Sequence, residues 1–192
     1  MKISHEFEVE RPIERVWETF QDVPTVAQCL PGASITEEKG DNVYAGAVEV
    51  KLGPMNAKFE GEATVTPDHS NHSGSIIGKG VDRSGGSRGS VDVEYRLAGI
   101  GGHTRVFVEA DIKLSGAVAQ FGRTGLIEEM SRRLIDELVY CLHSKLDAAT
   151  PEEAATIEAG DVKGIGLLFS SLVSWIGSLV KRLLGRIRKT AP

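Results

Sequence analysis

A long apolar stripe near the end of the chain constrains the fold more than any other feature. Within residues 117–146 large apolar side chains recur at every fourth position, and charged residues occupy much of the opposite side. The stripe consists of Leu126, Met130, Leu134, Leu138 and Leu142. This spacing predicts an amphipathic helix that buries one face. Gly122 and Gly125 favour a change of direction near its start.

The residues before this helix alternate between apolar and polar side chains, which is typical of strands. Alternation runs through residues 4–9, 43–52, 59–65, 91–97 and 105–114, and less regularly through 73–81. Two short helices are expected between Pro12 and Leu30. Successive alternating strands predict an antiparallel sheet with one buried face. We therefore expect an α+β fold, in which a curved antiparallel sheet of about seven strands wraps around a long C-terminal helix.

Small residues occupy sheet positions that should face the helix and would normally be bulky. Gly46, Gly61 and Ala63 lie on the predicted inner face of two neighbouring strands. Small inward residues permit either a close contact between helix and sheet or an internal cavity. The sequence leaves both alternatives open.

The charge is unevenly distributed along the chain. The sequence carries 22 basic and 27 acidic residues, and six of the basic ones follow Asp161, beyond which no acid occurs. Residues 1–162 therefore hold 16 basic and 27 acidic residues, a net charge of −11. An acidic body disfavours nucleic acid as a partner. We expect a folded domain over residues 1–149, a linker over 150–162 and an amphipathic basic tail over 163–192.

The tail has the pattern of a helix that lies on a membrane surface. Residues 164–180 carry no charge, and a helix of this length spans about 25 Å, which is shorter than the ~30 Å bilayer core. Large apolar residues fall on one half of its helical projection and serines and glycines on the other, with a basic end. This arrangement favours an interfacial helix on an anionic membrane over a spanning helix or a helix packed on the body or a partner. The residues expected to bind the membrane are Leu168, Phe169, Leu172, Trp175, Ile176, Leu179, Lys181, Arg182, Leu183, Arg186, Arg188 and Lys189.

The two cysteines show no spacing that would indicate a metal or redox motif. Cys29 and Cys141 stand far apart in the sequence, without a CxxC or Cys/His pattern. The chain also opens without a basic-then-apolar leader. We interpret this as a reducing, cytoplasmic setting with isolated cysteines.

Several short motifs carry a resemblance to a known family. They are Pro12-Ile13-Glu14-Arg15-Val16-Trp17, Asp22-Val23-Pro24, Cys29-Leu30-Pro31-Gly32-Ala33, Lys51-Leu52-Gly53-Pro54-Met55, Ala57-Lys58-Phe59-Glu60-Gly61 and Gly116-Ala117-Val118-Ala119-Gln120-Phe121-Gly122-Arg123. In sequence and order they resemble the carbon monoxide dehydrogenase G-subunit family of the START-like, or SRPBCC, superfamily. The resemblance implies a helix-grip fold, with seven antiparallel strands around a C-terminal helix. It also implies an accessory protein that attaches a molybdenum-containing carbon monoxide dehydrogenase or related hydroxylase to the inner face of the cytoplasmic membrane.

Quinone binding in the internal cavity has been proposed for this family, so the resemblance also suggests a ligand. We expect a quinone or other isoprenoid lipid, with a fatty acyl chain as second choice, and no tightly bound cofactor. The predicted pocket residues are Tyr44, Phe59, Tyr95, Phe121, Met130 and Leu134. Plain core packing is the alternative for each of them. Tyr44 or Tyr95 would supply the polar contact for a head group.

The motifs bring no catalytic residue, and the histidines are scattered without metal-ligand spacing. We therefore expect no enzymatic activity and no metal site. Two alternatives remain: a maturation or assembly factor for the same enzyme class, and a START-like enzyme acting on a hydrophobic small molecule.

Overall fold

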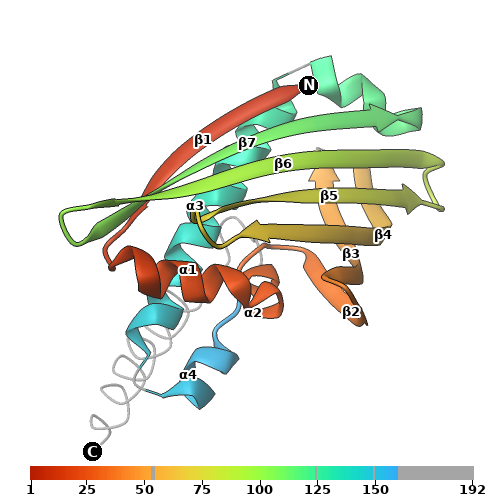
Figure 1. The fold of residues 1–192 in the computed structure, drawn as a ribbon. Coiled ribbons are helices and arrows are strands. Elements are labelled where there is room, and N and C mark those ends of the chain that lie inside the picture. Colours follow the sequence, from red (N-terminus) through yellow and green to blue (C-terminus); the bar gives the residue numbers. More distant parts are fainter. Residues whose placement is uncertain (53–54, 124, 149, 160–192) are drawn as a thin grey trace, which may run out of the picture. The chain divides into compact units, whose positions relative to one another are not determined.

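The computed structural model describes residues 1–52, 55–123, 125–148 and 150–159. The elements follow one another as predicted: a strand, two short helices, six strands, and a helical segment (Figure 1). Their bounds are β1 (Lys2–Val9), α1 (Ile13–Gln21), α2 (Val23–Gln28), β2 (Ala33–Gly40), β3 (Val43–Leu52), β4 (Met55–Asp68), β5 (Ser73–Asp82), β6 (Ser87–Ile100), β7 (His103–Ser115), η1 (Gly116–Arg123), α3 (Leu126–Asp147) and α4 (Pro151–Thr156). These elements form one compact unit, Met1–Ala159.

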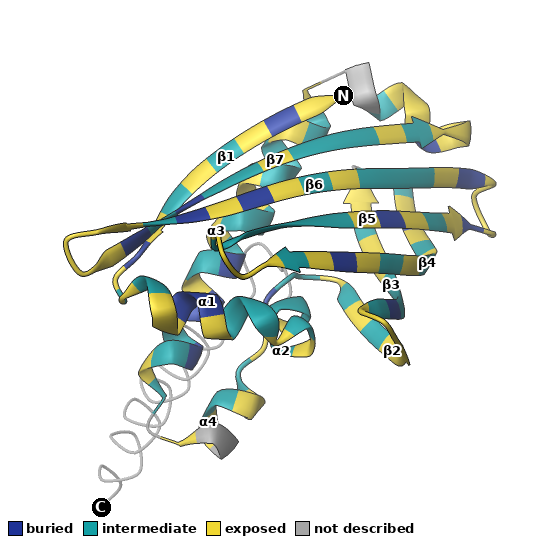
Figure 2. Ribbon diagram, viewed as in Figure 1, coloured by how far each residue is buried: buried dark blue, intermediate teal, exposed yellow. Residues whose placement is uncertain are grey.

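All seven strands join one antiparallel sheet in the order β1-β7-β6-β5-β4-β3-β2. Consecutive strands are neighbours except at β1, which pairs with β7 so that Lys2 lies opposite Asp111. The sheet curves, and α3 lies on its inner side (Figure 1). Exposed residues alternate with intermediate or buried ones along the strands (Figure 2), as expected for a sheet with one covered face. The predicted fold class is therefore confirmed.

The helical segment begins differently from the prediction of one helix over residues 117–146. Gly116–Arg123 forms a 3₁₀ helix, and α3 starts only at Leu126. Gly125, which precedes α3, has a φ of 69°, a conformation that glycine adopts without steric cost. The prediction of a single helix was wrong at this end, whereas the expected change of direction near Gly125 is confirmed.

The apolar stripe of α3 is unevenly covered along its length. Leu138, Cys141 and Leu142, in the C-terminal half, are buried. Leu126, Met130 and Leu134, in the N-terminal half, are only half-buried. Because large apolar side chains favour burial, the N-terminal half of α3 is the part of the stripe that still has apolar surface to cover.

The small inner residues lie where backbone of the neighbouring strand approaches closely, which is neither of the two alternatives expected from the sequence. Gly46, Gly61, Gly80 and Gly89 lie opposite one another across β3, β4, β5 and β6, and we call them the glycine row. A Cβ on Gly61 would lie 1.9 Å from the Lys79 carbonyl oxygen, and one on Gly46 would lie 2.3 Å from the Ser34 carbonyl oxygen. The row thus accommodates the close approach of backbone from the neighbouring strand.

The two cysteines are paired, which the sequence analysis did not foresee. Cys29, at the C-terminal end of α2, forms a disulfide with Cys141 of α3, across a sequence separation of 112 residues. Both side chains are buried, together with Leu138 and Leu142. The prediction of isolated cysteines was therefore wrong, because the fold brings two distant helices into contact at these positions.

The described part of the predicted linker packs on the domain. The buried Lys145 of α3 donates hydrogen bonds through Nζ to Gln28 Oε1 (2.8 Å) and the Ala154 carbonyl oxygen (2.9 Å). Ile157 packs against the disulfide cluster, and the Ala159 N–H donates to the Gln28 carbonyl oxygen at 2.9 Å. The remainder of the predicted linker, residues 160–162, and the predicted tail over 163–192 lie outside the described residues.

The turn between β5 and β6 is organised by a buried carboxylate. Asp82 accepts hydrogen bonds from the Ser84 hydroxyl (2.7 Å), the Ser84 N–H (3.0 Å) and the Gly85 N–H (3.0 Å). These bonds hold the pKa of the Asp82 carboxyl below its usual range. Next to it, the Ser87 hydroxyl oxygen accepts from the Val118 N–H, which attaches η1 to this turn.

Because the Asp82 pKa is lower in the folded than in the unfolded chain, its contribution to stability is present above about pH 4. It is lost as the pH falls through the folded-state pKa. We expect the free energy of unfolding to fall less between pH 6 and pH 3 in the Asp82→Asn variant than in the natural sequence. Urea unfolding at both pH values measures this difference. Asp92→Asn is the control, since Asp92 is exposed and has no hydrogen-bond partner among the described residues; an equal effect of both substitutions would contradict this role of Asp82.

Candidate ligand site

One of the predicted pocket residues lies in a closed core. Tyr95 of β6 is buried with Trp17 of α1, Leu97 and Val106. A Cβ on Gly74, its partner on β5, would lie 2.4 Å from the Tyr95 hydroxyl oxygen, so the tyrosine occupies the space that this glycine leaves open. Burial raises the pKa of the Tyr95 hydroxyl. These contacts form the packed base of the domain under α1.

A second apolar cluster, at the start of α3, is less complete. Only Ala57 and Val118 are fully buried there, and the larger side chains around them keep part of their surface exposed. These half-buried residues are Val50, Met55, Phe59, Leu114, Phe121, Leu126, Ile127 and Met130. Phe59, Phe121 and Met130, three of the predicted pocket residues, are thus brought together by β4, η1 and α3.

The glycine row shapes the sheet side of this cluster. A Cβ on Gly80 would lie 3.1 Å from the Phe59 Cβ, and one on Gly89 would lie 3.5 Å from Phe59 Cε1. The phenyl ring therefore rests on the part of the inner sheet face that has no side chains. The sequence pattern predicts Phe59 on the inner face of the sheet, but it does not show that the ring lies against the glycine row.

The inner sheet face next to this cluster also retains uncovered apolar surface. Val48 of β3 lies opposite Phe59 and has the same strand parity as Val50 and Tyr44, yet it is 44% exposed. We use the name inner apolar patch for Val48, Val50, Phe59, Leu114, Phe121, Leu126, Ile127 and Met130. Leu134 is half-buried one helical turn beyond the patch. An exposed valine on the covered face of a sheet was not predictable from alternation, which assigns it to the core.

Tyr44 is placed at the far side of β3, close to acidic groups. It is buried, and its pKa is raised by burial and by the negative charges of Glu38 and Asp22. Tyr44 is therefore a buried polar group on the inner face, close to the carboxylates of Glu38 and Asp22.

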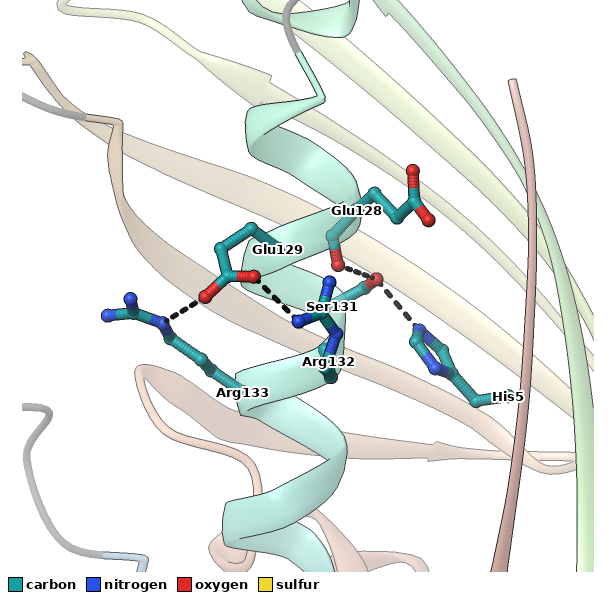
Figure 3. A network of polar contacts seen from close by, with 6 residues as sticks. All are labelled: His5, Glu128, Glu129, Ser131, Arg132 and Arg133. Carbon is teal, nitrogen blue, oxygen red and sulfur yellow. Dashed lines mark hydrogen bonds and ion pairs between the residues drawn. The ribbon is translucent and has the colours of Figure 1, made fainter.

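A hydrogen bond closes the gap between the sheet edge and α3 (Figure 3). His5 of β1 approaches Ser131 of α3 with its Nε2 at 2.8 Å from Oγ. The Ser131 hydroxyl donates its proton to the Glu128 carbonyl oxygen (2.8 Å), so its oxygen accepts from the His5 Nε2–H. On the same helix, Glu129 binds Arg132 and Arg133, each at 3.0 Å.

The site thus offers partly exposed apolar surface on the covered side of the sheet. In the described part of the chain, no three histidine, cysteine or acidic residues lie close enough to hold a metal ion. No helix among the described residues is long and apolar enough to cross a membrane. The predicted membrane-binding residues lie outside those described.

Comparisons with known proteins agree with this architecture. A family model described as the G subunit of carbon monoxide dehydrogenase (CoxG) matches residues 6–147. No curated protein matches the chain significantly.

Among solved structures, a conserved protein from Geobacillus kaustophilus is similar at a TM-score of 0.68 and 16% identity, covering 76% of this chain and 95% of that one. A protein from Thermus thermophilus has a TM-score of 0.58 and 14% identity, covering 78% and 99%. The Zhui aromatase/cyclase from Streptomyces sp. R1128 has a TM-score of 0.56 and 17% identity, covering 78% and 97%. At these identities the likeness establishes the fold.

Proposed function

Because the chain belongs to the carbon monoxide dehydrogenase G-subunit family, we propose that it is a membrane-tethered, non-catalytic accessory protein. It recruits a carbon monoxide dehydrogenase-like molybdenum hydroxylase to the inner face of the cytoplasmic membrane. It binds an apolar ligand, a quinone or other isoprenoid lipid, between the sheet and α3. A fatty acyl chain is the second ligand class.

The inner apolar patch is the observation that carries the ligand proposal. Its large side chains come from the sheet, η1 and α3 and remain half-buried or exposed, although they lie on the covered side of the sheet. Fully burying one such side chain contributes about 1.5–3 kcal/mol. A molecule that covers several of them therefore gains enough free energy for micromolar binding after the cost of association.

A substitution that fills the patch tests the ligand proposal. We expect Val48→Trp to weaken binding of decylubiquinone at least about tenfold, because the indole would occupy apolar surface that the quinone covers. Quenching of tryptophan fluorescence in the full-length protein measures this. Ile100→Trp is the control, since Ile100 is 46% exposed but lies at the tip of the β6–β7 hairpin. Equal binding by the natural sequence and both variants would contradict the proposed site.

The amphipathic basic sequence of the tail supports the tether. Five basic residues beyond Val180 contribute roughly 1 kcal/mol each near an anionic surface, and partly inserted apolar side chains add a comparable amount. Two signals of this kind suffice for stable, reversible attachment.

Liposome flotation tests the tether. The full-length protein should float with vesicles that contain phosphatidylglycerol, and a chain ending at Ala159 should remain in the dense fraction. Ala159 is a suitable end because the contacts of α4 and Ala159 with the domain are kept. Flotation of both proteins to the same extent would reject the tether.

Two other functions are weighed against this one. The aromatase/cyclase likeness favours a START-like enzyme that acts on a hydrophobic small molecule; such an enzyme would release a chemically altered ligand, detectable by mass spectrometry of extracted lipids. A maturation factor for the same hydroxylase would bind the enzyme only before its molybdenum centre is complete. Co-purification with metal-loaded and metal-free hydroxylase separates recruitment from maturation.

A further inference from the structure

A hollow of about 710 Å³ lies on the outer face of the sheet, away from the inner apolar patch. It crosses four strands, β4 to β7, and is lined by cations, hydroxyls and aliphatic side chains, besides two glutamates. We use the name outer hollow for the surface formed by six of the lining residues: Lys79, Arg88, Lys113, Ser90, Ile77 and Val81. All except Ser90 are exposed.

The register of the strands gathers the three cations. Lys79 of β5 and Lys113 of β7 both lie opposite Ser90 of β6, so their Cα atoms are roughly 10 Å apart across one intervening strand. Arg88 lies two residues from Ser90 on the same side of the sheet. Long basic side chains at these positions can reach a common group above Ser90.

Acidic groups stand near these cations without binding them. Neither Lys79, Arg88 nor Lys113 forms an ion pair with a described residue, although Glu62 lies directly opposite Lys79 and Glu60 lines the same hollow. Glu62 instead binds Lys39 at 2.7 Å, and Glu60 binds Lys58 at 3.5 Å. Asp111, near Lys113, binds the N-terminal ammonium group at 3.0 Å. An unpaired cationic cluster thus remains on a domain whose sequence is strongly acidic.

The outer hollow also carries apolar surface. Ile77 is 51% and Val81 is 41% exposed, and both belong to β5 beside Lys79. Cations beside aliphatic side chains complement a polypeptide that has both carboxylates and an apolar residue. A flat anionic membrane fits less well, because the surface is hollowed.

We propose that the outer hollow docks an acidic segment of the recruited hydroxylase. Its carboxylates bind Lys79, Arg88 and Lys113, and an apolar side chain covers Ile77 and Val81. This inference rests on the proposed recruitment and assigns the surface that performs it. The inner apolar patch, on the opposite face of the sheet, stays available to a ligand while the hydroxylase is bound.

Binding of the purified molybdenum hydroxylase from the same cells to the immobilised full-length protein tests the proposal, without membranes. We expect Lys79→Glu/Arg88→Glu/Lys113→Glu to weaken binding at least about 100-fold, because three attractive contacts become repulsive. The matched control is Arg15→Glu/Lys51→Glu/Arg132→Glu, which changes the net charge equally at exposed positions outside the hollow. It should change the Kd less than about threefold.

The outcomes separate the two proposals. If the natural sequence does not bind the hydroxylase, recruitment itself is wrong. If it binds and both triple variants bind equally well, the outer hollow is not the docking surface. If the hollow variant keeps hydroxylase binding but loses binding to phosphatidylglycerol vesicles, the hollow faces lipid and the docking proposal is overturned. Should the triple variant fail to fold, Lys79→Gln/Lys113→Gln must still weaken binding and lower its dependence on salt.

Discussion

Replacing Cys29 and Cys141 together by serine should lower the free energy of unfolding by about 2–5 kcal/mol. The disulfide joins residues separated by 112 positions, so it removes much of the conformational freedom of the unfolded chain. It also joins α2 to α3 inside a buried cluster. Urea unfolding of the oxidised natural protein and of the double variant measures the loss.

Reduction provides the control for this prediction. Dithiothreitol should destabilise the natural sequence and leave the double variant unchanged, since the variant has no cysteine left. Equal stability of the natural protein with and without reductant would show that the covalent bond contributes nothing. Disulfides are rare in a reducing cytosol, so alkylation of thiols in protein trapped directly from cells would also reveal whether the pair is oxidised at the proposed location.

Gly61→Ala should be the most damaging small substitution in the sheet, with an expected loss of about 3 kcal/mol or more. The added methyl group would lie 1.9 Å from the Lys79 carbonyl oxygen and 2.7 Å from the Gly80 Cα. Both are backbone atoms, so relief requires a strand to move. Thermal and urea unfolding measure the effect.

Gly99→Ala is the matched control, because Gly99 also lies within a strand and its Cβ would meet only the Ile13 side chain, at 3.5 Å. It should be neutral or stabilising by up to about 1 kcal/mol, since alanine loses less conformational freedom on folding. Similar losses at both positions would mean that the close approach of backbone to Gly61 does not limit the residue at that position.

Much of this fold was predictable because its periodic signals are strong. The four-residue repeat from Leu126 to Leu142 predicted α3, and alternation located six of the seven strands within a few residues. Both signals report which face of an element is buried. They do not report how neighbouring elements bend or where a turn of helix changes type, so η1 was assigned to α3.

The candidate site was less predictable, because it depends on contacts between distant residues. Phe59, Phe121 and Met130, predicted to line a pocket, lie in one apolar cluster. Tyr95 instead packs with Trp17, a contact that strand parity cannot distinguish from one in a pocket. The exposure of Val48 and the pairing of Cys29 with Cys141 depend on how elements that are distant in the sequence meet in the fold. Neither leaves a local pattern in the sequence.

The direction of the Ser131 hydroxyl has a consequence for the edge of the sheet. Since its proton is directed to the Glu128 carbonyl oxygen, the imidazole of His5 donates through Nε2 to the Ser131 oxygen. β1 is an edge strand, paired on one side only. The bond from His5 therefore gives this strand a second attachment, and any separation of β1 from α3 has to break it.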